Sequence, residues 1–456
     1  MKDNVLTYQE AEDFFNKGNE FFEKKDYVNA IPYFEKASQH PEHYRAINRL
    51  GYLYLNGFGT DKKYDIAFDC FQRAANLGFD KAQYNLSKMY YSGKGGEQSY
   101  ILAFEWMLKA ADQGFSPAQK TIAVMYINGK GVEQNYQLAY EWFLKAANQG
   151  HRIAQFNLGV MYETGKGVEQ NYQLAYEWYL KAANQGHRIA QFNLGVMYDT
   201  GKGVEQNYQL AHEWYLKAAE QKDCHAQFNL GLLYSNGNGV KQNNQLAYEW
   251  FLKAANQGHS NAQFRLGLLY KQGKGITLSE GTAWEWFLKA ANQGNIKALD
   301  YIHTLVDTSS ISIDVDRKLI FECIDLYGKY KNIDVTGMLE KTIKDLFKQD
   351  EFKGFDLVKF RAEEQQCKLC QYYLAWAYEN GKGVRLDYEN AFCWYQKAAE
   401  AGVVIAMNHL AKFYEKGLAS EIDLNKALEW YGKSCDARNK DGCRNYARLF
   451  KKIQKK

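Results

Sequence analysis

Cysteines and histidines are the side chains of this sequence best suited to chemistry, and their spacing favours structural roles. Cys367 and Cys370 have the spacing of half a zinc site, but no second pair and no His-x3–5-His sequence follows at a suitable distance. Histidines recur at 151, 187 and 259, in phase with a repeat, which indicates exposed or hydrogen-bonded turn residues rather than general bases. We therefore predict packing thiols, turn histidines and no metal site.

A glycine-rich sequence, Gly165-Lys166-Gly167, could suggest a phosphate-binding loop. A P-loop needs wider glycine spacing, a Lys-Ser/Thr pair and a preceding strand. Here the tripeptide recurs between expected helices, so we interpret it as a turn. The sequence also contains no Gly-x-Ser-x-Gly or His-Glu-x-x-His motif. We predict that the protein is not an enzyme, has no catalytic residues and needs no cofactor.

The elements that hold these residues belong to a repeated block of 36 residues, the distance from Ala154 to Ala190. In the copy that begins at Ala154, Leu158 and Tyr162 lie on one face of a first helix, which the Gly-x-Gly turn ends. Trp178 marks one face of a second helix. One copy cannot bury enough apolar surface to offset the entropy of ordering it, so neighbouring copies must stack. The repeat therefore predicts an all-α solenoid.

The repeated pattern A-x3-L-G-x2-Y-x2-G-x-G-V…A-x2-W-x2-K-A-A-x2-G resembles the Sel1-like repeat. The segment 11–45 resembles a tetratricopeptide repeat, which is a helix pair with a tighter loop. The resemblance is strong over 46–297 and 370–441 and weak between them. It implies a right-handed α-solenoid that serves as an adaptor or scaffold for proteins and peptides.

The repeat phase divides the chain into five expected segments. We predict, in order, one tetratricopeptide-like unit over 11–45, seven Sel1-like units over 46–297, two degenerate helical units over 298–369, two further Sel1-like units over 370–441, and a capping helix with a basic tail over 442–456.

The last full unit resembles the helicobacter cysteine-rich proteins, a subgroup of the family. Lys433-Ser434-Cys435 and Asp441-Gly442-Cys443 reproduce the cysteine spacing that carries a disulfide between adjacent helices in that subgroup. Because the sequence begins without an apolar leader, we favour reduced thiols at Cys435 and Cys443, with a disulfide as the alternative.

Alignment of Gly159 and Tyr162 with the tetratricopeptide pattern implies which side chains face a concave groove. These residues are Phe156, Val160 and Glu163, then Phe192, Val196 and Asp199, then Phe228 and Leu232, then Phe264, Leu268 and Lys271. The set predicts an apolar, aromatic strip with charged groups at its edge, and a contiguous exposed strip of this kind usually marks a binding site. Partial burial by tight superhelical closure is the alternative.

Charge and hydropathy limit the function classes. The net charge of +4 is small for 456 residues and argues against nucleic acid, and no uninterrupted apolar run has the ~18 residues that membrane insertion needs. We predict a cytoplasmic scaffold that binds a protein or peptide partner. The alternatives are an interaction protein exported without a signal peptide that engages a host molecule, and a small-molecule-binding or hydrolytic cysteine-rich protein. Partner identity and oligomeric state stay open.

Overall fold

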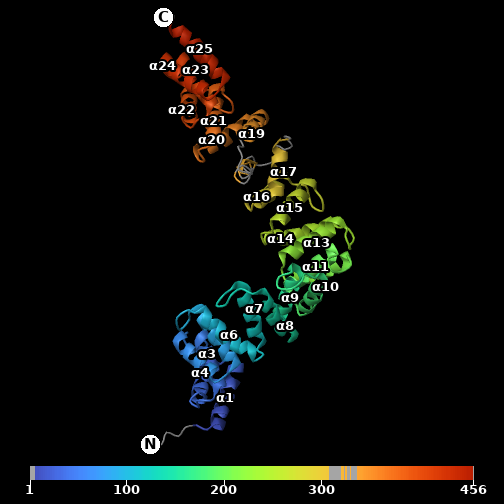
Figure 1. The fold of residues 1–456 in the computed structure, drawn as a ribbon. Helices are drawn as coiled ribbons and strands as arrows, with labels where there is room; N and C mark the ends of the chain where they lie inside the picture. The colour runs from blue at the N-terminus through green and yellow to red at the C-terminus, as the bar shows by residue number, and fades with distance from the viewer. Residues whose placement is uncertain (1–5, 308–319, 323, 326–328, 330–335, 455–456) are drawn as a thin grey trace. The chain divides into compact units, whose positions relative to one another are not determined.

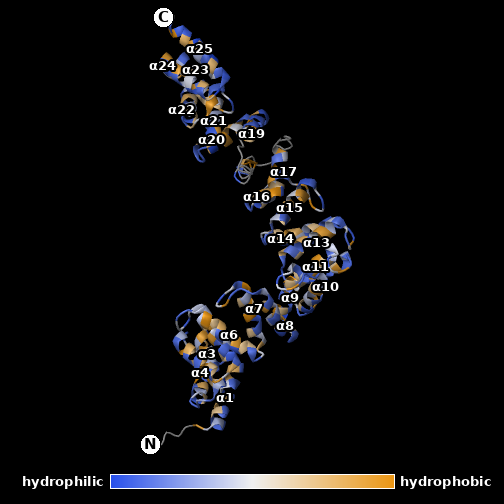
Figure 2. Cartoon of the chain, viewed as in Figure 1, coloured by the Kyte–Doolittle hydropathy of each residue, from blue (hydrophilic) through white to orange (hydrophobic). Residues whose placement is uncertain are grey.

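The structure is a computed structural model that describes residues 6–307, 320–322, 324–325, 329 and 336–454 (Figure 1). Within those ranges α-helix is the only regular secondary structure, and the helices follow one another in tandem pairs. Apolar and polar residues alternate along the helices, as Figure 2 shows. The predicted all-α solenoid is confirmed.

The chain forms two compact units, residues 1–242 (unit 1) and residues 243–456 (unit 2). In unit 1 the odd-numbered helices are the first helices of pairs, and each of them from α1 to α11 packs on the even-numbered second helix that follows it. Its helices are α1 (Tyr8–Glu23), α2 (Tyr27–Ala37), α3 (Tyr44–Asn56), α4 (Tyr64–Asn76), α5 (Asp80–Ser92), α6 (Tyr100–Asp112), α7 (Ser116–Asn128), α8 (Tyr136–Asn148), α9 (Arg152–Thr164), α10 (Tyr172–Asn184), α11 (Arg188–Thr200), α12 (Tyr208–Glu220) and α13 (Cys224–Asn236).

Unit 2 continues the same alternation of odd-numbered first helices and even-numbered second helices. Its helices are α14 (Asn244–Asn256), α15 (Ser260–Gln272), α16 (Glu280–Asn292), α17 (Ile296–Asp307), α19 (Thr336–Gln349), α20 (Glu351–Glu363), α21 (Lys368–Asn380), α22 (Tyr388–Glu400), α23 (Val404–Lys416), α24 (Leu424–Asp436) and α25 (Lys440–Gln454). Parts of the two predicted degenerate units, residues 308–319 and 330–335, lie outside the described residues.

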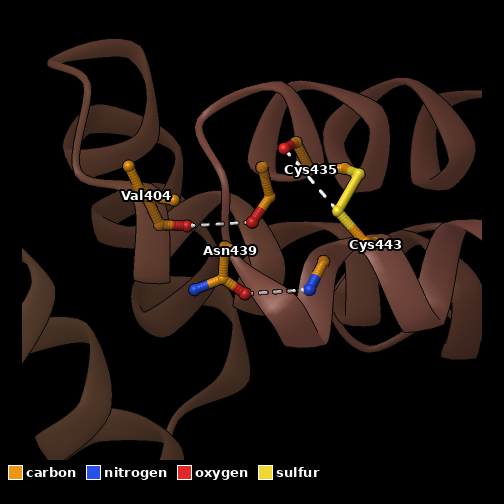
Figure 3. The surroundings of a disulfide bond; sticks show 6 residues. Val404, Cys435, Asn439 and Cys443 are labelled. Atoms are coloured by element: carbon orange, nitrogen blue, oxygen red, sulfur yellow. Dashed lines mark hydrogen bonds between the residues drawn. A yellow bond between two sulfur atoms is a disulfide. The ribbon is translucent and has the colours of Figure 1, made fainter.

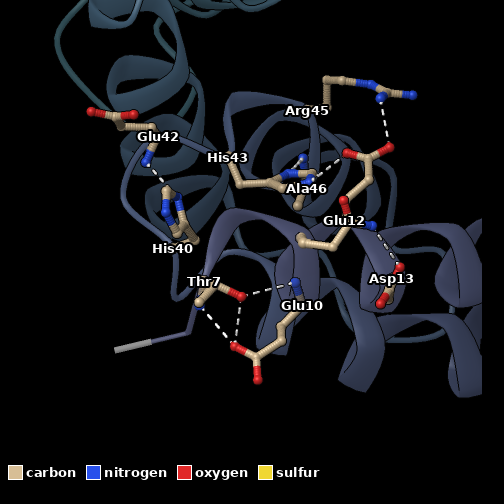
Figure 4. A network of polar contacts seen from close by, with 10 residues as sticks. Thr7, Glu10, Glu12, Asp13, His40, Glu42, His43, Arg45 and Ala46 are labelled. Atoms are coloured by element: carbon tan, nitrogen blue, oxygen red, sulfur yellow. Dashed lines mark hydrogen bonds and ion pairs between the residues drawn. The ribbon is translucent and has the colours of Figure 1, made fainter. Parts of the chain in front are cut away.

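The first helix of unit 1 begins at a capping box. The Thr7 hydroxyl accepts a hydrogen bond from the Glu10 N–H at 3.3 Å, and the Glu10 carboxylate accepts one from the Thr7 N–H at 2.8 Å (Figure 4). This reciprocal pair satisfies two N–H groups that a helix start leaves free. Glu12 then connects α1 to the next pair. One of its carboxylate oxygens lies 3.0 Å from His43 Nε2, and the other lies 3.0 Å from Arg45 Nη1.

In several pairs a glycine of the first helix permits the close approach of the second helix. In α9, Gly159 lies directly against the ring of Tyr179 in α10, and a Cβ at Gly159 would overlap that ring. Tyr179 is fully buried, whereas its neighbour Trp178, the residue singled out from the sequence, is 9% exposed. The largest fully buried side chain of this pair is therefore one that the sequence pattern did not identify.

The Gly-x-Gly tripeptide is a turn, as predicted. Gly165 ends α9 in the left-handed region with φ 70°, and Gly167 has φ 76° and lies against the backbone of Tyr136 in the preceding pair. Glycine adopts this region without Cβ strain, and only glycine lets two backbones come so close.

The recurring histidines cap the first helices. Nδ1 of His151, His187 and His259 accepts a hydrogen bond from the N–H three residues on, at 3.3, 3.2 and 3.2 Å. They are hydrogen-bonded turn residues, as predicted. Cys367 occupies the same place at the start of α21, where its Sγ accepts from the N–H of the fully buried Cys370 at 3.3 Å. Both thiols have the packing role that the sequence predicts.

Candidate binding surface

The predicted groove residues of unit 1 lie on the first helices α9, α11 and α13, and every one of them is half-buried. The Phe156 ring stacks on His187 at 4.4 Å and packs 5.8 Å from the Tyr179 ring. Ile153 and Ile189, at the starts of α9 and α11, are 41% and 43% exposed. Because Ile153 precedes Phe156 by three residues, the two side chains share one face of α9. We call Ile153, Phe156, Val160, Ile189, Phe192, Val196, Phe228 and Leu232 the apolar strip.

The groove residues of unit 2 are also half-buried, on α15. The Phe264 ring packs 5.9 Å from Phe287 and 5.8 Å from Tyr301. Leu268 packs against the same apolar core. The Lys271 ammonium lies 3.6 Å from a carboxylate oxygen of Glu280, so this predicted edge charge has an internal partner.

The predicted acidic edge in unit 1 also has internal partners. Glu163 accepts a hydrogen bond from the hydroxyl of Tyr179 at 2.6 Å, and Asp199 accepts one from Tyr215 at 3.1 Å. Burial is the larger cause of the raised pKa of the Tyr179 hydroxyl, and its hydrogen bond to Glu163 adds to it. Burial also raises the pKa of Asp199, against the hydrogen bond from Tyr215. Each carboxylate therefore satisfies a buried hydroxyl, which the sequence analysis did not foresee.

A cavity of about 570 Å³ lies between the first helices of three consecutive pairs in unit 1, α3, α5 and α7. We call it the lysine cavity. Its lysines are Lys62, Lys88, Lys94 and Lys120, and its other named lining residues are Leu55, Asn56, Tyr64, Tyr84, Ser87, Met89, Tyr91, Ser92, Met107, Thr121 and Met125. Tyr84 and Lys120 are the counterparts of Phe156 in their own repeats, so the cavity lies at groove positions of the N-terminal copies.

Unit 2 has a cavity of about 490 Å³ that is lined mainly by its first helices α19, α21 and α23. Its aromatic wall consists of Phe347, Tyr372, Tyr373 and Trp376. Its three lysines are in ion pairs. Lys344 lies 2.6 Å from Glu340, Lys348 lies 3.8 Å from Asp345, and Lys382 lies 2.7 Å from Glu351. This cavity is therefore aromatic with paired charges, unlike the lysine cavity.

The structure joins Cys435 and Cys443 in a disulfide, so our preference for two reduced thiols is corrected (Figure 3). Cys435 lies in the last turn of α24 and Cys443 in the first turn of α25, and their Cα atoms are 4.4 Å apart, within the range of a bridge. Gly442 permits this approach because its backbone lies against Ser434. The preference for thiols followed from the expected redox compartment, and the amino-acid sequence does not give the distance between the two Cα atoms.

Among the described residues, no group of three or more His, Cys, Asp or Glu side chains is placed to hold a metal ion. In the same part of the chain, no helix is both long enough and apolar enough to cross a bilayer.

Tandem helix pairs with cavities along their first helices define an α-solenoid of the helix-pair repeat class. The family model described as Sel1 repeat matches residues 13–40, 45–79, 80–115, 116–151, 152–187, 188–223, 224–259, 260–295, 368–403 and 404–439. This is well over half of the chain, which therefore belongs to the Sel1 repeat family. No curated protein matches the chain.

Two solved structures share sequence as well as fold with this chain. The protective antigen c5321 of uropathogenic Escherichia coli, which displays an SLR fold, is 33% identical, with a TM-score of 0.62, and the match covers 92% of this chain and 90% of that one. A Sel1 repeat protein from Oxalobacter formigenes is 32% identical, with a TM-score of 0.52, over 65% of this chain and 86% of that one.

Proposed function

We propose that this chain is a non-enzymatic scaffold that binds a peptide or protein partner on the surface of its first helices. The observation that carries the proposal is that three consecutive first helices line one cavity in unit 1, and that three in unit 2 line another. A surface hollowed across successive repeats fits an extended segment that contacts each repeat in turn.

The apolar strip supplies the expected anchors. Its members keep part of their surface exposed, although Phe156, Val160 and Phe192 pack on neighbouring rings or aliphatic side chains. Rings that are held in place lose little conformational entropy when a partner covers them, which is why aromatic side chains dominate binding surfaces.

Introducing negative charge into the apolar strip tests the proposal. The full chain captures partners from a lysate of its own organism, and the most enriched partner is purified and its Kd measured. We expect the triple variant Phe156→Glu, Phe192→Glu, Phe228→Glu to bind about ten-fold more weakly or worse, because three carboxylates would have to be desolvated at the contact.

The matched control is Gln137→Glu, Gln173→Glu, Gln209→Glu. It adds the same charge at exposed positions of the second helices α8, α10 and α12 and should leave the Kd unchanged. Should the triple phenylalanine variant unfold by circular dichroism, Val160→Glu with Val196→Glu tests the same surface. A folded strip variant that binds as tightly as the wild type would refute the proposal.

A second candidate is an interaction protein that acts outside the cell that makes it. The observation behind it is that the similar Escherichia coli protein is described as a protective antigen. Protease treatment of intact cells separates the two candidates, because only a surface-exposed chain is cut under conditions that spare a cytoplasmic marker.

A further inference from the structure

The lysine cavity has one sign of charge. Four lysines line it, Lys62, Lys88, Lys94 and Lys120. All of its lining residues belong to the described part of unit 1, and none of them is aspartate or glutamate. The lysines come from α5, α7 and the turns that follow α3 and α5. Four ammonium groups around one hollow create a positive potential that the low-dielectric walls focus into it.

None of these four ammonium groups has a carboxylate at ion-pair distance among the described residues. Two of them lie over aromatic rings. The Lys88 Nζ is 5.4 Å from the centroid of the Tyr84 ring, and the Lys94 Nζ is 5.3 Å from the centroid of the Tyr64 ring. Burial, and then the charge of Lys88, lower the pKa of Lys120. Lys88 and Lys120 therefore repel each other, and all four lysines lack the carboxylate partners that Lys344 and Lys382 have in unit 2.

The uncharged lining adds two further requirements for a ligand. Met89, Met107 and Met125 are buried side chains that contribute to the wall, and a thioether adapts to irregular apolar groups. Tyr84 and Tyr91 add phenol rings to the lining. The cavity thus combines separated positive charges with an adaptable apolar surface.

We propose that the lysine cavity binds an acidic peptide segment, in which several carboxylates contact the lysines and an apolar side chain packs on the methionines. Lysine is a compact point charge on a long stem, which suits carboxylates spaced along an extended chain better than one planar group. This inference rests on the proposed function and deepens it, because it names the chemistry of the partner.

Fluorescence anisotropy on the full chain tests the inference. The probe is a fluorescein-labelled peptide of repeated Glu-Glu-Leu triplets, and it is compared with the same peptide in which Lys replaces each Glu. We expect the acidic peptide to bind and the basic one not to, and we expect added salt to weaken the complex because the attraction is electrostatic.

Two charge-matched double variants locate the binding. Lys88→Glu with Lys120→Glu reverses two charges in the cavity, and Lys166→Glu with Lys202→Glu reverses two exposed lysines in the Gly-x-Gly turns of the same unit. We expect the first to weaken binding by at least about ten-fold and the second by less than about two-fold. Should the first variant lose its helical circular dichroism, Lys88→Gln with Lys120→Gln replaces it.

Three results with these probes would each overturn the inference, and a fourth comes from the captured partner. They are equal affinities of the two double variants, equal binding of the acidic and basic peptides, and tighter direct binding of inositol hexakisphosphate than of the acidic peptide, which would assign the cavity to a phosphate ligand. The partner captured for the proposed function separates the two ideas. If its binding fails with the phenylalanine variant but survives the cavity variant, the acidic-peptide inference falls and the scaffold stands.

Discussion

Replacement of Gly159 by valine is expected to destabilise unit 1 by about 3 kcal/mol or more, the upper range for overpacking a dense core. A Cβ at this position already overlaps the ring of Tyr179, which is fully buried and cannot swing into solvent. Valine adds two further methyl groups at the same place. Chemical unfolding of the full chain, with hydrogen exchange of the α9 and α10 amides to locate the change, measures the effect.

Alanine at Gly159 should be much milder, and the chain itself gives the reason. Other repeats carry alanine at the equivalent position, Ala375 and Ala411, opposite fully buried tyrosines. A small shift of the ring therefore makes room for one methyl group. We expect a loss of about 1 kcal/mol for Gly159→Ala, the low end for overpacking.

The matched control for Gly159→Val is Gly281→Val, because a Cβ at Gly281 meets no atom within 4 Å. That variant should change stability by less than about 1 kcal/mol, the range of helix propensity. A double variant with Tyr179→Leu should remove more than half of the valine effect, since a smaller side chain then faces Gly159. Equal destabilisation by Gly159→Val and Gly281→Val would contradict the role of the glycine.

The burial of a tyrosine in a second helix could have been predicted from the sequence, because a carboxylate precedes it at a fixed distance. A carboxylate stands 16 residues before each of four buried tyrosines and accepts a hydrogen bond from its hydroxyl, in Glu163–Tyr179, Asp199–Tyr215, Glu379–Tyr395 and Glu415–Tyr431. Where phenylalanine takes the tyrosine position, as at Phe143, Phe251 and Phe287, the earlier residue is Ile127, Ser235 and Lys271. The pairing follows from the need of a buried hydroxyl for an acceptor.

The fold was predictable because its signals are local and repeated. The Gly-x-Gly turn, the small residues such as Gly159 and the tryptophan positions recur at a constant distance, so each copy supports the others. The lysine cavity was not predicted, because the N-terminal copies replace Phe156 by Tyr84 and Lys120 at the same repeat position. Only the packing of α3, α5 and α7 shows that these side chains share one hollow.

Replacement of Glu379 by glutamine is expected to lower the stability of unit 2 by about 2 kcal/mol at pH 7. A fall of the carboxyl pKa from 4.5 to about 2 corresponds to about 3 kcal/mol, and solvent screening reduces that amount. The Glu379 side chain is only 11% exposed. Its oxygens accept a hydrogen bond from the Tyr395 hydroxyl at 2.6 Å and lie 3.1 Å from the Lys412 ammonium. His409 Nδ1 lies 3.3 Å from the oxygen that Tyr395 contacts.

The sign of the pH dependence follows from the direction of the shift. Burial raises the pKa of Glu379, but the hydrogen bonds from His409, Tyr395 and Lys412 outweigh it and lower the pKa from 4.5 to about 2. The folded state therefore binds fewer protons here than the unfolded state. The stabilisation is fully present above pH 4.5 and is lost as the pH falls through that value toward about 2.

Unfolding curves at pH 7, 5, 4 and 3 measure this effect. The matched control is Glu421→Gln, because Glu421 is an exposed carboxylate in the turn between α23 and α24. The difference in free energy of unfolding between the wild type and Glu379→Gln should be largest at pH 7 and 5 and should shrink below pH 4.5, where the ionised Glu379 carboxylate contributes less stability to the wild type. The control should track the wild type at every pH. A difference that stays constant from pH 7 to pH 3 would mean that glutamine acts through lost packing, and that the charge of Glu379 does not hold these three partners together.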